Sequence, residues 1–273
     1  MRRGHCDDPG PGVTPPDLSR RAILAATAAA AAFGPVRTGA ADAPGPMAQD
    51  RPVRIAMILY PGMTALDVVG PQALLAGLAP NSLHCVAQSA GPVASDMGLS
   101  LVATHSFETC PPDLDVLLVP GGDGTPGQMC DAALLGFLRA RAPGTAWVTS
   151  VCTGSLILGA AGLLRGYRAT SHWCVRDAVL PLLRAVPVAE RVVFDRNRVT
   201  ASGVSAGLDL GLALAARLRG PDYARTAQLV AEYAPEPPFR AGTPAQAGPT
   251  IVRAADAILA PLVAGSIRAA RGD

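Results

Sequence analysis

The sequence predicts an α/β fold, a three-layer sandwich in which a mostly parallel sheet carries helices on both faces. Short, continuous apolar runs alternate with helical segments of about 10–15 residues, which is typical of parallel strands joined by helical crossovers. Hydrophobic residues make up 49% and charged residues 16% of the 273 residues, as expected of a globular chain with a large core. One main domain that needs no disulfide or metal to stabilise it fits this length.

The expected elements are read in chain order from apolar runs and their Gly and Pro boundaries. A buried strand over residues 53–60 is followed by a helix over residues 66–78, in which Pro71 suits a first turn. A second strand is expected next, and then a hairpin that turns near residues 96–98. From the second strand onward, the expected elements are strand 82–88, hairpin 93–103, strand 114–119, helix 126–142, strand 145–151, helix 154–164, strand 167–169, helix 175–183, strands 191–194 and 198–200, and helix 204–218.

Charge and composition exclude several functions. The formal net charge is only +2, so no strong electrostatic field for nucleic acid or acidic lipid follows, and we expect no nucleic-acid partner and no stable membrane anchor. The sequence contains no lysine, because all 23 basic residues are arginine. This excludes a Schiff-base lysine, a covalent pyridoxal-phosphate anchor and a lysine-containing phosphate loop.

Residues 1–49 are predicted to be an export signal followed by a linker. Arg20 and Arg21 stand directly before an alanine-rich apolar run over residues 22–34, which is too short to span a bilayer, and small residues follow. This order resembles a twin-arginine signal, so a periplasmic or exported protein is expected. The alternatives are a disordered basic tail, or a start at Met47 and a cytoplasmic protein.

The strongest chemical signal is a cysteine at a sharp turn from strand to helix. An apolar strand ends at Cys152 and a helix starts directly behind it, as in a nucleophile elbow. The helix N-terminus favours a thiolate, so we expect the pKa of Cys152 to be lowered; a buried structural thiol is the alternative. No C-x-x-C pair occurs, so neither a zinc ribbon nor a thioredoxin-type pair is supported.

Two other strand ends carry candidate residues. Pro120-Gly121-Gly122 follows an expected central strand, and free N–H groups there could stabilise an anion on a substrate, although an ordinary turn is the alternative. Asp67 lies seven residues after the first strand, among apolar neighbours. It is either a helix N-cap or an active-site acid, and its spacing alone favours the cap.

Four segments resemble the ThiJ/PfpI superfamily, and most closely its isonitrile hydratases. They are VCTGSLILGAAGLLRGYRATSHW at 151–173, DVVGP at 67–71, PGG at 120–122 and EYAPEPPF at 232–239. The resemblance covers residues 54–239 and implies a flavodoxin-like fold of the class I glutamine amidotransferase type. The first segment also resembles the sensor domains of AraC-like regulators, whereas the Asp67 segment and the last segment favour the hydratases.

The resemblance implies a role for each matching position. Cys152 corresponds to the nucleophile and Asp67 to the acid beside the thiol, which reverses the interpretation as a cap. Thr153 contributes a hydroxyl and stands where the protease-like members have histidine, which counts against a peptidase. Three positions are implied to bind substrate through their backbone. Gly122 corresponds to an N–H donor, and Gly203 and Val204 correspond to the backbone wall opposite the thiol.

The implied reaction is the hydration of isonitriles to N-substituted formamides through a covalent thioimidate, with Asp67 as acid and then base and with no metal or organic cofactor. His172 is expected to be structural rather than a base. The alternatives are a ligand-sensing or thiol stress-response protein that acts on reactive carbonyls, and an AraC-type sensor domain without its DNA-binding domain. The resemblance implies a small-molecule substrate and a homodimer. The expected organisation is a signal and linker at 1–49, the ThiJ/PfpI domain at 50–240 and a helical tail at 241–273.

Overall fold

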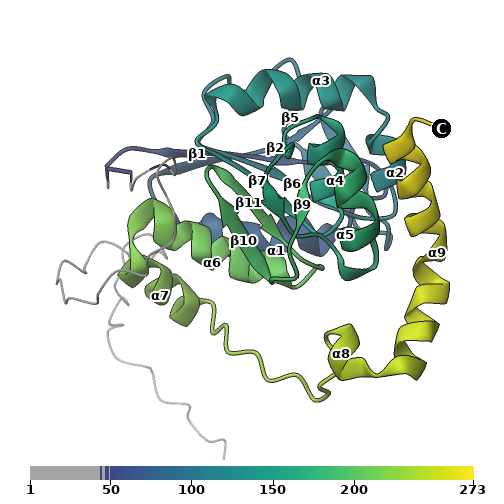
Figure 1. Ribbon diagram of the computed structural model, residues 1–273. Helices are drawn as coiled ribbons and strands as arrows, with labels where there is room; N and C mark the ends of the chain where they lie inside the picture. Colours follow the sequence, from purple (N-terminus) through teal and green to yellow (C-terminus); the bar gives the residue numbers. More distant parts are fainter. Residues whose placement is uncertain (1–43, 45–46, 49) are drawn as a thin grey trace, which may run out of the picture.

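The computed structural model describes residues 44, 47–48 and 50–273, so the predicted export signal lies outside the described residues. A seven-stranded sheet in the order β10-β11-β7-β6-β1-β2-β5 forms the centre of the fold (Figure 1). All its neighbouring strands run parallel except the edge pair β10 and β11. The strands are β1 Val53–Ile58, β2 Asn81–Ala87, β5 His105–Ser106, β6 Val116–Val119, β7 Trp147–Val151, β10 Val192–Asp195 and β11 Arg198–Ala201.

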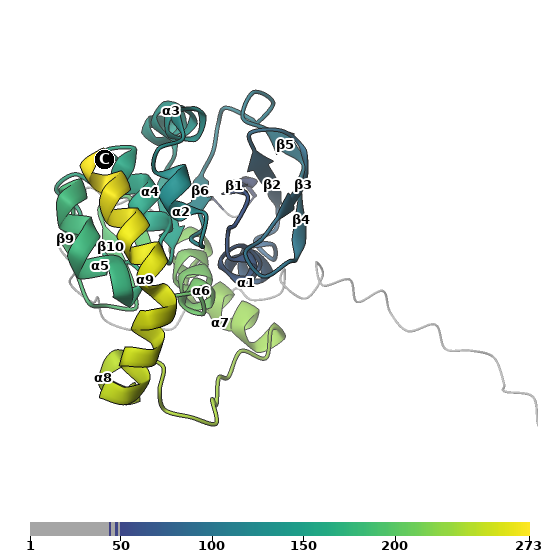
Figure 2. The ribbon, with the colours of Figure 1, turned by 90° about the vertical axis from the view of Figure 1, so that its right-hand side faces the viewer.

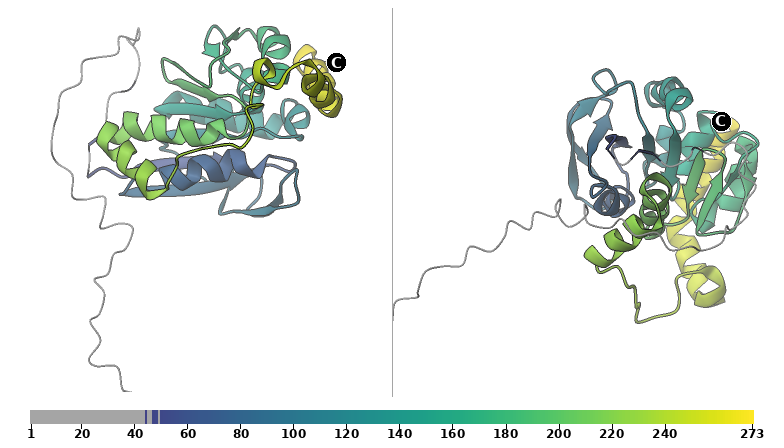
Figure 3. Two further views of the ribbon diagram at one scale, coloured as in Figure 1. Left: turned by 90° about the horizontal axis from the view of Figure 1, so that it is seen from below. Right: turned by 90° about the vertical axis from the view of Figure 1, so that its left-hand side faces the viewer.

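Helices cover both faces of this sheet, which confirms the predicted three-layer α/β sandwich. On one face, α1 (Ala65–Leu75) packs along α6 (Ala206–Arg219), as the views from below and from the left show (Figure 3). On the other face lie α3 (Ala132–Arg141) and α4 (Gly154–Ala160). Every residue of β6 and β7 is buried, because both faces of a parallel sheet are covered.

The structure changes four of the expected elements. The helix expected over residues 126–142 is two helices, α2 (Thr125–Gln128) and α3, because the Asp131 carboxylate accepts hydrogen bonds from two backbone N–H groups and caps α3. Pro71 lies inside α1 rather than in its first turn, where it packs on Gly207 and Gly211 of α6.

The third change concerns the strand expected over residues 167–169. It is β8 (Arg168–Ala169), which pairs with β9 (Val186–Pro187) outside the main sheet. The expected hairpin is confirmed as the antiparallel pair β3 (Gly91–Ala94) and β4 (Ser100–Ala103). The helix expected over residues 175–183 divides into α5 (Trp173–Val179) and a 3-10 turn (Leu180–Leu183).

The chain after α6 forms three further helices. They are α7 (Pro221–Val230), the short α8 (Pro244–Ala247) and the long α9 (Pro249–Arg271). Figure 2 shows α9 crossing in front of the body, where it packs on α2 and α5. By length and composition alone α9 could cross a membrane. Its Ser266 is fully buried, and Gly265 lies against Pro126 of α2.

Candidate functional site

Cys152 lies at the tight turn that the sequence predicts between β7 and α4. Its φ of 57° is in the left-handed region, which is strained for a residue with a side chain. Its backbone N–H donates to the carbonyl oxygens of Ala201 (3.1 Å) and Ser202 (2.9 Å). Its own carbonyl oxygen accepts a 3.1 Å hydrogen bond from the Ser171 hydroxyl. These contacts with two other segments fix the unusual conformation of the nucleophile candidate.

The thiol of Cys152 is buried, with 5% of the residue exposed. Burial and the negative charge of Asp67 raise the pKa of Cys152 well above its usual range, so the predicted lowering is wrong. The N–H groups of Val204 and Thr153 hydrogen-bond the sulfur and lower its pKa, but by less than burial raises it. The resting site therefore holds a neutral thiol with two amide donors ready to stabilise a thiolate.

Asp67 lies in the first turn of α1 and is fully buried. Thr64 occupies the N-cap position of this helix, so the interpretation of Asp67 as the cap is wrong. One carboxyl oxygen, Oδ2, accepts a 2.8 Å hydrogen bond from the N–H of Gly121. The other, Oδ1, is buried without a hydrogen-bond partner among the described residues.

Burial makes Asp67 an acid that keeps its proton at neutral pH. The pKa of Asp67 is raised from 3.8 to about 8. Burial is the largest cause of the rise, the hydrogen bond from Gly121 opposes it, and the negative charge of Asp96 adds to it. Because Oδ2 is already an acceptor, the proton belongs on Oδ1. The carboxyl group is thus a neutral donor in the neighbourhood of the Cys152 thiol.

The glycine loop before α2 is tightly packed against the elbow. A Cβ at Gly121 would lie 2.5 Å from the Thr153 nitrogen and 2.9 Å from the Cys152 Cβ, so only glycine fits. Gly122 has a φ of 137°, and its N–H donates a 3.0 Å hydrogen bond to Oγ1 of Thr153. The structure therefore differs from the expected free amide at Gly122, because the Thr153 hydroxyl already occupies it.

Two residues that the sequence analysis did not select lie behind this loop. The Tyr60 hydroxyl donates to the carbonyl oxygen of Pro120 (2.9 Å) and lies 3.3 Å from Oγ1 of Thr125. Thr125 in turn lies 2.7 Å from Oγ1 of Thr153. Tyr60 follows the first strand and Thr125 follows the glycine loop, so both lie at the same edge of the sheet as Cys152, which is the signal that could have found them.

The wall opposite the elbow contains Gly203, Val204 and His172. The N–H of Val204 reaches the thiol, as described above, and a Cβ at Gly203 would lie 2.7 Å from the His172 ring. His172 caps α5, with its Nδ1 accepting from the N–H of Cys174 and lying 3.0 Å from the Cys174 sulfur. Burial lowers the pKa of His172, which fits a neutral, structural histidine.

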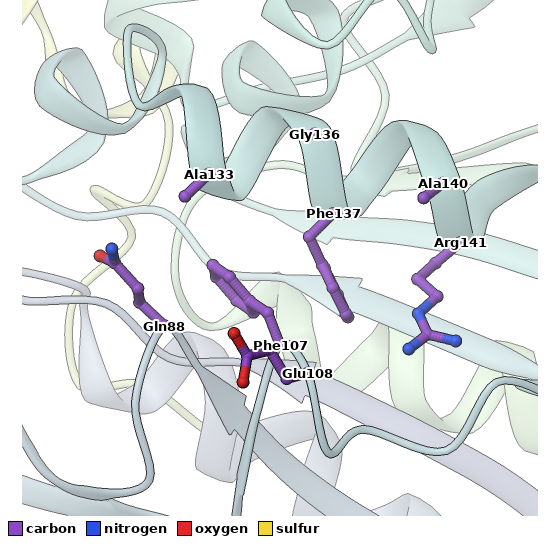
Figure 4. A pocket seen from close by; sticks show the side chains of 8 residues that line it. All are labelled: Gln88, Phe107, Glu108, Ala133, Gly136, Phe137, Ala140 and Arg141. Atoms are coloured by element: carbon purple, nitrogen blue, oxygen red, sulfur yellow. The ribbon is translucent and has the colours of Figure 1, made fainter.

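A separate cavity of about 510 Å³ lies away from this site, between α3 and the segment after β5 (Figure 4). The rings of Phe107 and Phe137 stack in it with centroids 4.6 Å apart, and the Arg141 guanidinium lies over Phe137. None of the predicted site residues lines this cavity. Across the described part of the chain, no group of three or more His, Cys, Asp or Glu side chains could hold a metal ion.

A family profile, curated proteins and a solved structure are similar to this chain. The DJ-1/PfpI family profile matches residues 53–217. The chain is 48% identical over 200 residues to the isonitrile hydratase of Pseudomonas putida, which covers 73% of this chain and 87% of that protein. The crystal structure of a ThiJ/PfpI family protein from Pseudomonas syringae superposes with a TM-score of 0.79 at 48% identity, covering 81% of this chain and 91% of that one. The chain is also 31% identical over 186 residues to the HTH-type transcriptional regulator GbdR of Pseudomonas aeruginosa, covering 65% of this chain and 50% of that protein.

Proposed function

The chain belongs to the DJ-1/PfpI family, and from this premise we propose that it hydrates isonitriles to N-substituted formamides, with Cys152 as the nucleophile. One observation carries the proposal: a buried carboxyl group that keeps its proton up to a pH of about 8 accompanies a buried thiol. Addition of a thiol to an isonitrile needs a nucleophilic sulfur and a proton for carbon, and this pair supplies both.

In the first step the Cys152 sulfur bonds to the terminal carbon of R–N≡C. Asp67 delivers the proton on Oδ1 to the same carbon, and the carboxylate that forms takes up the thiol proton. The product is the thioimidate R–N=CH–S–Cys152, and Asp67 is again a carboxylic acid. The N–H groups of Val204 and Thr153 stabilise the negative charge that develops on sulfur during the transfer.

In the second step water adds across the C=N bond of the thioimidate. The hydroxyl group joins carbon and a proton reaches nitrogen, with Asp67 as the group that exchanges it. The C–S bond then breaks while the hydroxyl proton passes to sulfur, which gives R–NH–CHO and the free thiol. All atoms of the isonitrile and of water are in the formamide, so the reaction needs no redox partner or organic cofactor.

The other residues implied to act here have supporting roles. Thr153 contributes its N–H to the sulfur and its hydroxyl to the glycine loop. Val204 contributes the second N–H, and Gly203 leaves room for the His172 ring beside it. Gly122 serves substrate only if its N–H exchanges Thr153 for the bound molecule, since the two are joined in the resting site.

The test is a panel of small alkyl and aryl isonitriles, with formamide measured directly by mass. Wild type should form formamide, Cys152→Ser should form none, and Asp67→Asn should be slower by about 10²–10⁴-fold, the usual contribution of general acid–base catalysis. Asp67→Glu tests the position of the acid. Cys85→Ser, at a half-buried thiol of β2, is the matched control and should retain full activity.

The same panel separates the alternatives. No formamide from any isonitrile, together with Cys152-dependent loss of methylglyoxal, would favour a thiol protein that acts on reactive carbonyls. Tight binding without turnover would favour a ligand sensor, a role that the 31% identity to a transcriptional regulator keeps open. Formamide that persists in Cys152→Ser would overturn the nucleophile.

We also propose that the protein is exported and forms a homodimer. For export, changing both Arg20 and Arg21 to lysine should retain the precursor in the cytoplasm, and unchanged fractionation would contradict it.

For the dimer, light scattering at micromolar concentration should give twice the monomer mass.

A further inference from the structure

Three buried hydroxyl groups join the two ends of the glycine loop behind the nucleophile. The contacts run from the Gly122 N–H to Thr153 Oγ1 (3.0 Å), from there to Thr125 Oγ1 (2.7 Å), and from there to the Tyr60 hydroxyl (3.3 Å). The Tyr60 hydroxyl closes the path on the carbonyl oxygen of Pro120, at 2.9 Å. Thr125 and Thr153 are fully buried and Tyr60 is 3% exposed, so these hydroxyls take their partners from the protein.

Counting the hydroxyl protons gives this series of hydrogen bonds a single direction. A carbonyl oxygen can only accept, so the single Tyr60 proton is committed to Pro120, and Tyr60 must accept from Thr125. The single proton of Thr125 is then used, so Thr125 must accept from Thr153. Thr153 donates to Thr125 and accepts from the Gly122 N–H. Each hydroxyl has one donor and one acceptor role, and no link can reverse without breaking another.

This series of hydrogen bonds joins the two ends of the glycine loop, and the same loop holds the side chain of Asp67. The Pro120 carbonyl and the Gly122 N–H are its two fixed ends, and the Gly121 N–H between them donates to Oδ2 of Asp67. We propose that Tyr60 and Thr125 are positioning residues of the reaction. Their hydroxyls, acting through Thr153, orient the Gly121 N–H so that it holds Oδ2 of Asp67 and leaves Oδ1 as the proton-donating oxygen. This inference rests on the proposed role of Asp67 as the acid.

The titratable groups around Asp67 set the sign of the expected change. Asp96 raises its pKa, and Cys152 and Tyr60 are the other ionisable groups coupled to it. The Gly121 hydrogen bond is the contact that lowers it. A loop that no longer aims this N–H must therefore raise the pKa of Asp67 above about 8.

The experiment measures the ionisation of Asp67 itself, by infrared spectroscopy of the protonated carboxyl band against pH. The Asp67→Asn variant identifies the band by removing it. Thr125→Val keeps the shape but removes the middle hydroxyl, and Thr125→Ser restores it. Thr149→Val is the matched control, because Thr149 is fully buried and donates to the Leu117 carbonyl (3.2 Å) outside this loop.

Thr125→Val and Tyr60→Phe should move the midpoint upward by about one pH unit, since a hydrogen bond to a charged group is worth about that much. Thr125→Ser and Thr149→Val should leave it at the wild-type value. An unmoved midpoint in Thr125→Val would overturn the proposal, and so would a shift of equal size in Thr149→Val. If Thr125→Val does not fold, Tyr60→Phe gives the same reading.

The infrared measurement of the Asp67 midpoint does not depend on the substrate. If no isonitrile is hydrated, the proposed function fails, but the infrared midpoint still decides whether the hydroxyls orient Asp67. If isonitriles are hydrated, Thr125→Val should lower kcat by about tenfold or more while Thr125→Ser recovers it. Hydration that is unchanged in Thr125→Val, with an unmoved midpoint, would overturn the positioning role alone.

Discussion

The negative charge of Asp67 raises the pKa of the Cys152 thiol, and burial raises the pKa of both groups. Placing one negative charge in this site therefore costs free energy, and placing a second charge beside the first costs more. In the resting state at neutral pH the carboxyl is protonated and the thiol is neutral. A charge forms only when the substrate carbon can accept the proton, which ties thiol activation to bound substrate.

This resting state predicts the pH dependence of turnover. The active form carries a protonated Asp67, which is lost as the pH rises through about 8. The hydration rate should therefore be level near pH 6–7 and fall above pH 8, when it is measured with saturating isonitrile. The residual rate of Asp67→Asn should lack this fall. A rate that climbs through pH 8–9 would instead indicate that thiolate formation controls the reaction.

The same carboxyl group predicts how stability depends on pH. Its pKa is about 8 when folded and near 3.8 when unfolded, so the folded protein holds a proton that the unfolded chain releases between these values. The stabilisation from this group is complete below about pH 4 and is lost as the pH rises through about 8. Asp67→Asn removes this loss, so its melting temperature should gain on that of wild type from pH 5 to pH 8. A difference that stays constant over this range would contradict the raised pKa.

Thiol labelling gives a third test, in which the structure reverses the expectation from the sequence. The elbow and the helix N-terminus favour a thiolate at Cys152, but α4 is short and the thiol is 5% exposed. Cys130 lies exposed before α3. Limited iodoacetamide at pH 6.5 should therefore label Cys130 first and Cys152 slowly, as read by peptide mapping. Cys130→Ser should lose the fast phase, and fast labelling of Cys152 would restore the original expectation.

The sequence predicts those parts of the fold whose signal is local. Strands such as β6 and β7 are continuous apolar runs, and the flanking Gly and Pro residues mark their ends. The sequence does not predict the two-residue strand β5, and it predicts β8 as a strand but not its pairing with β9 outside the main sheet. Strands this short carry no periodicity, and their pairing depends on distant partners. The break between α2 and α3 depends on how the Asp131 side chain turns back on the backbone, which composition does not reveal.

The site divides in the same way. The position of Cys152 follows from the order of strand and helix, and the pairing with Asp67 follows from a resemblance rather than from spacing. The pKa of Cys152 goes in the unexpected direction because burial arises from the whole tertiary structure, whereas the helix dipole is a local property. Tyr60 and Thr125 are ordinary residues in the sequence and gain a role only when the fold brings their hydroxyls together.

Gly121 gives the last test, because it lies where the glycine loop meets the elbow. A methyl group there would approach the backbone nitrogen of Thr153 to 2.5 Å, and backbone cannot move aside as a flexible side chain can. Gly121→Ala should lower the free energy of unfolding by about 1–3 kcal/mol or more and abolish turnover, because the shift displaces both the thiol and the N–H that holds Asp67. Urea unfolding followed by circular dichroism measures the first effect and formamide production the second. Gly127→Ala in α2 is the control, since open space surrounds that position, and it should change stability by less than about 0.5 kcal/mol. Full activity in Gly121→Ala would mean that the loop is free to move away from the elbow and that its close packing does not position the acid.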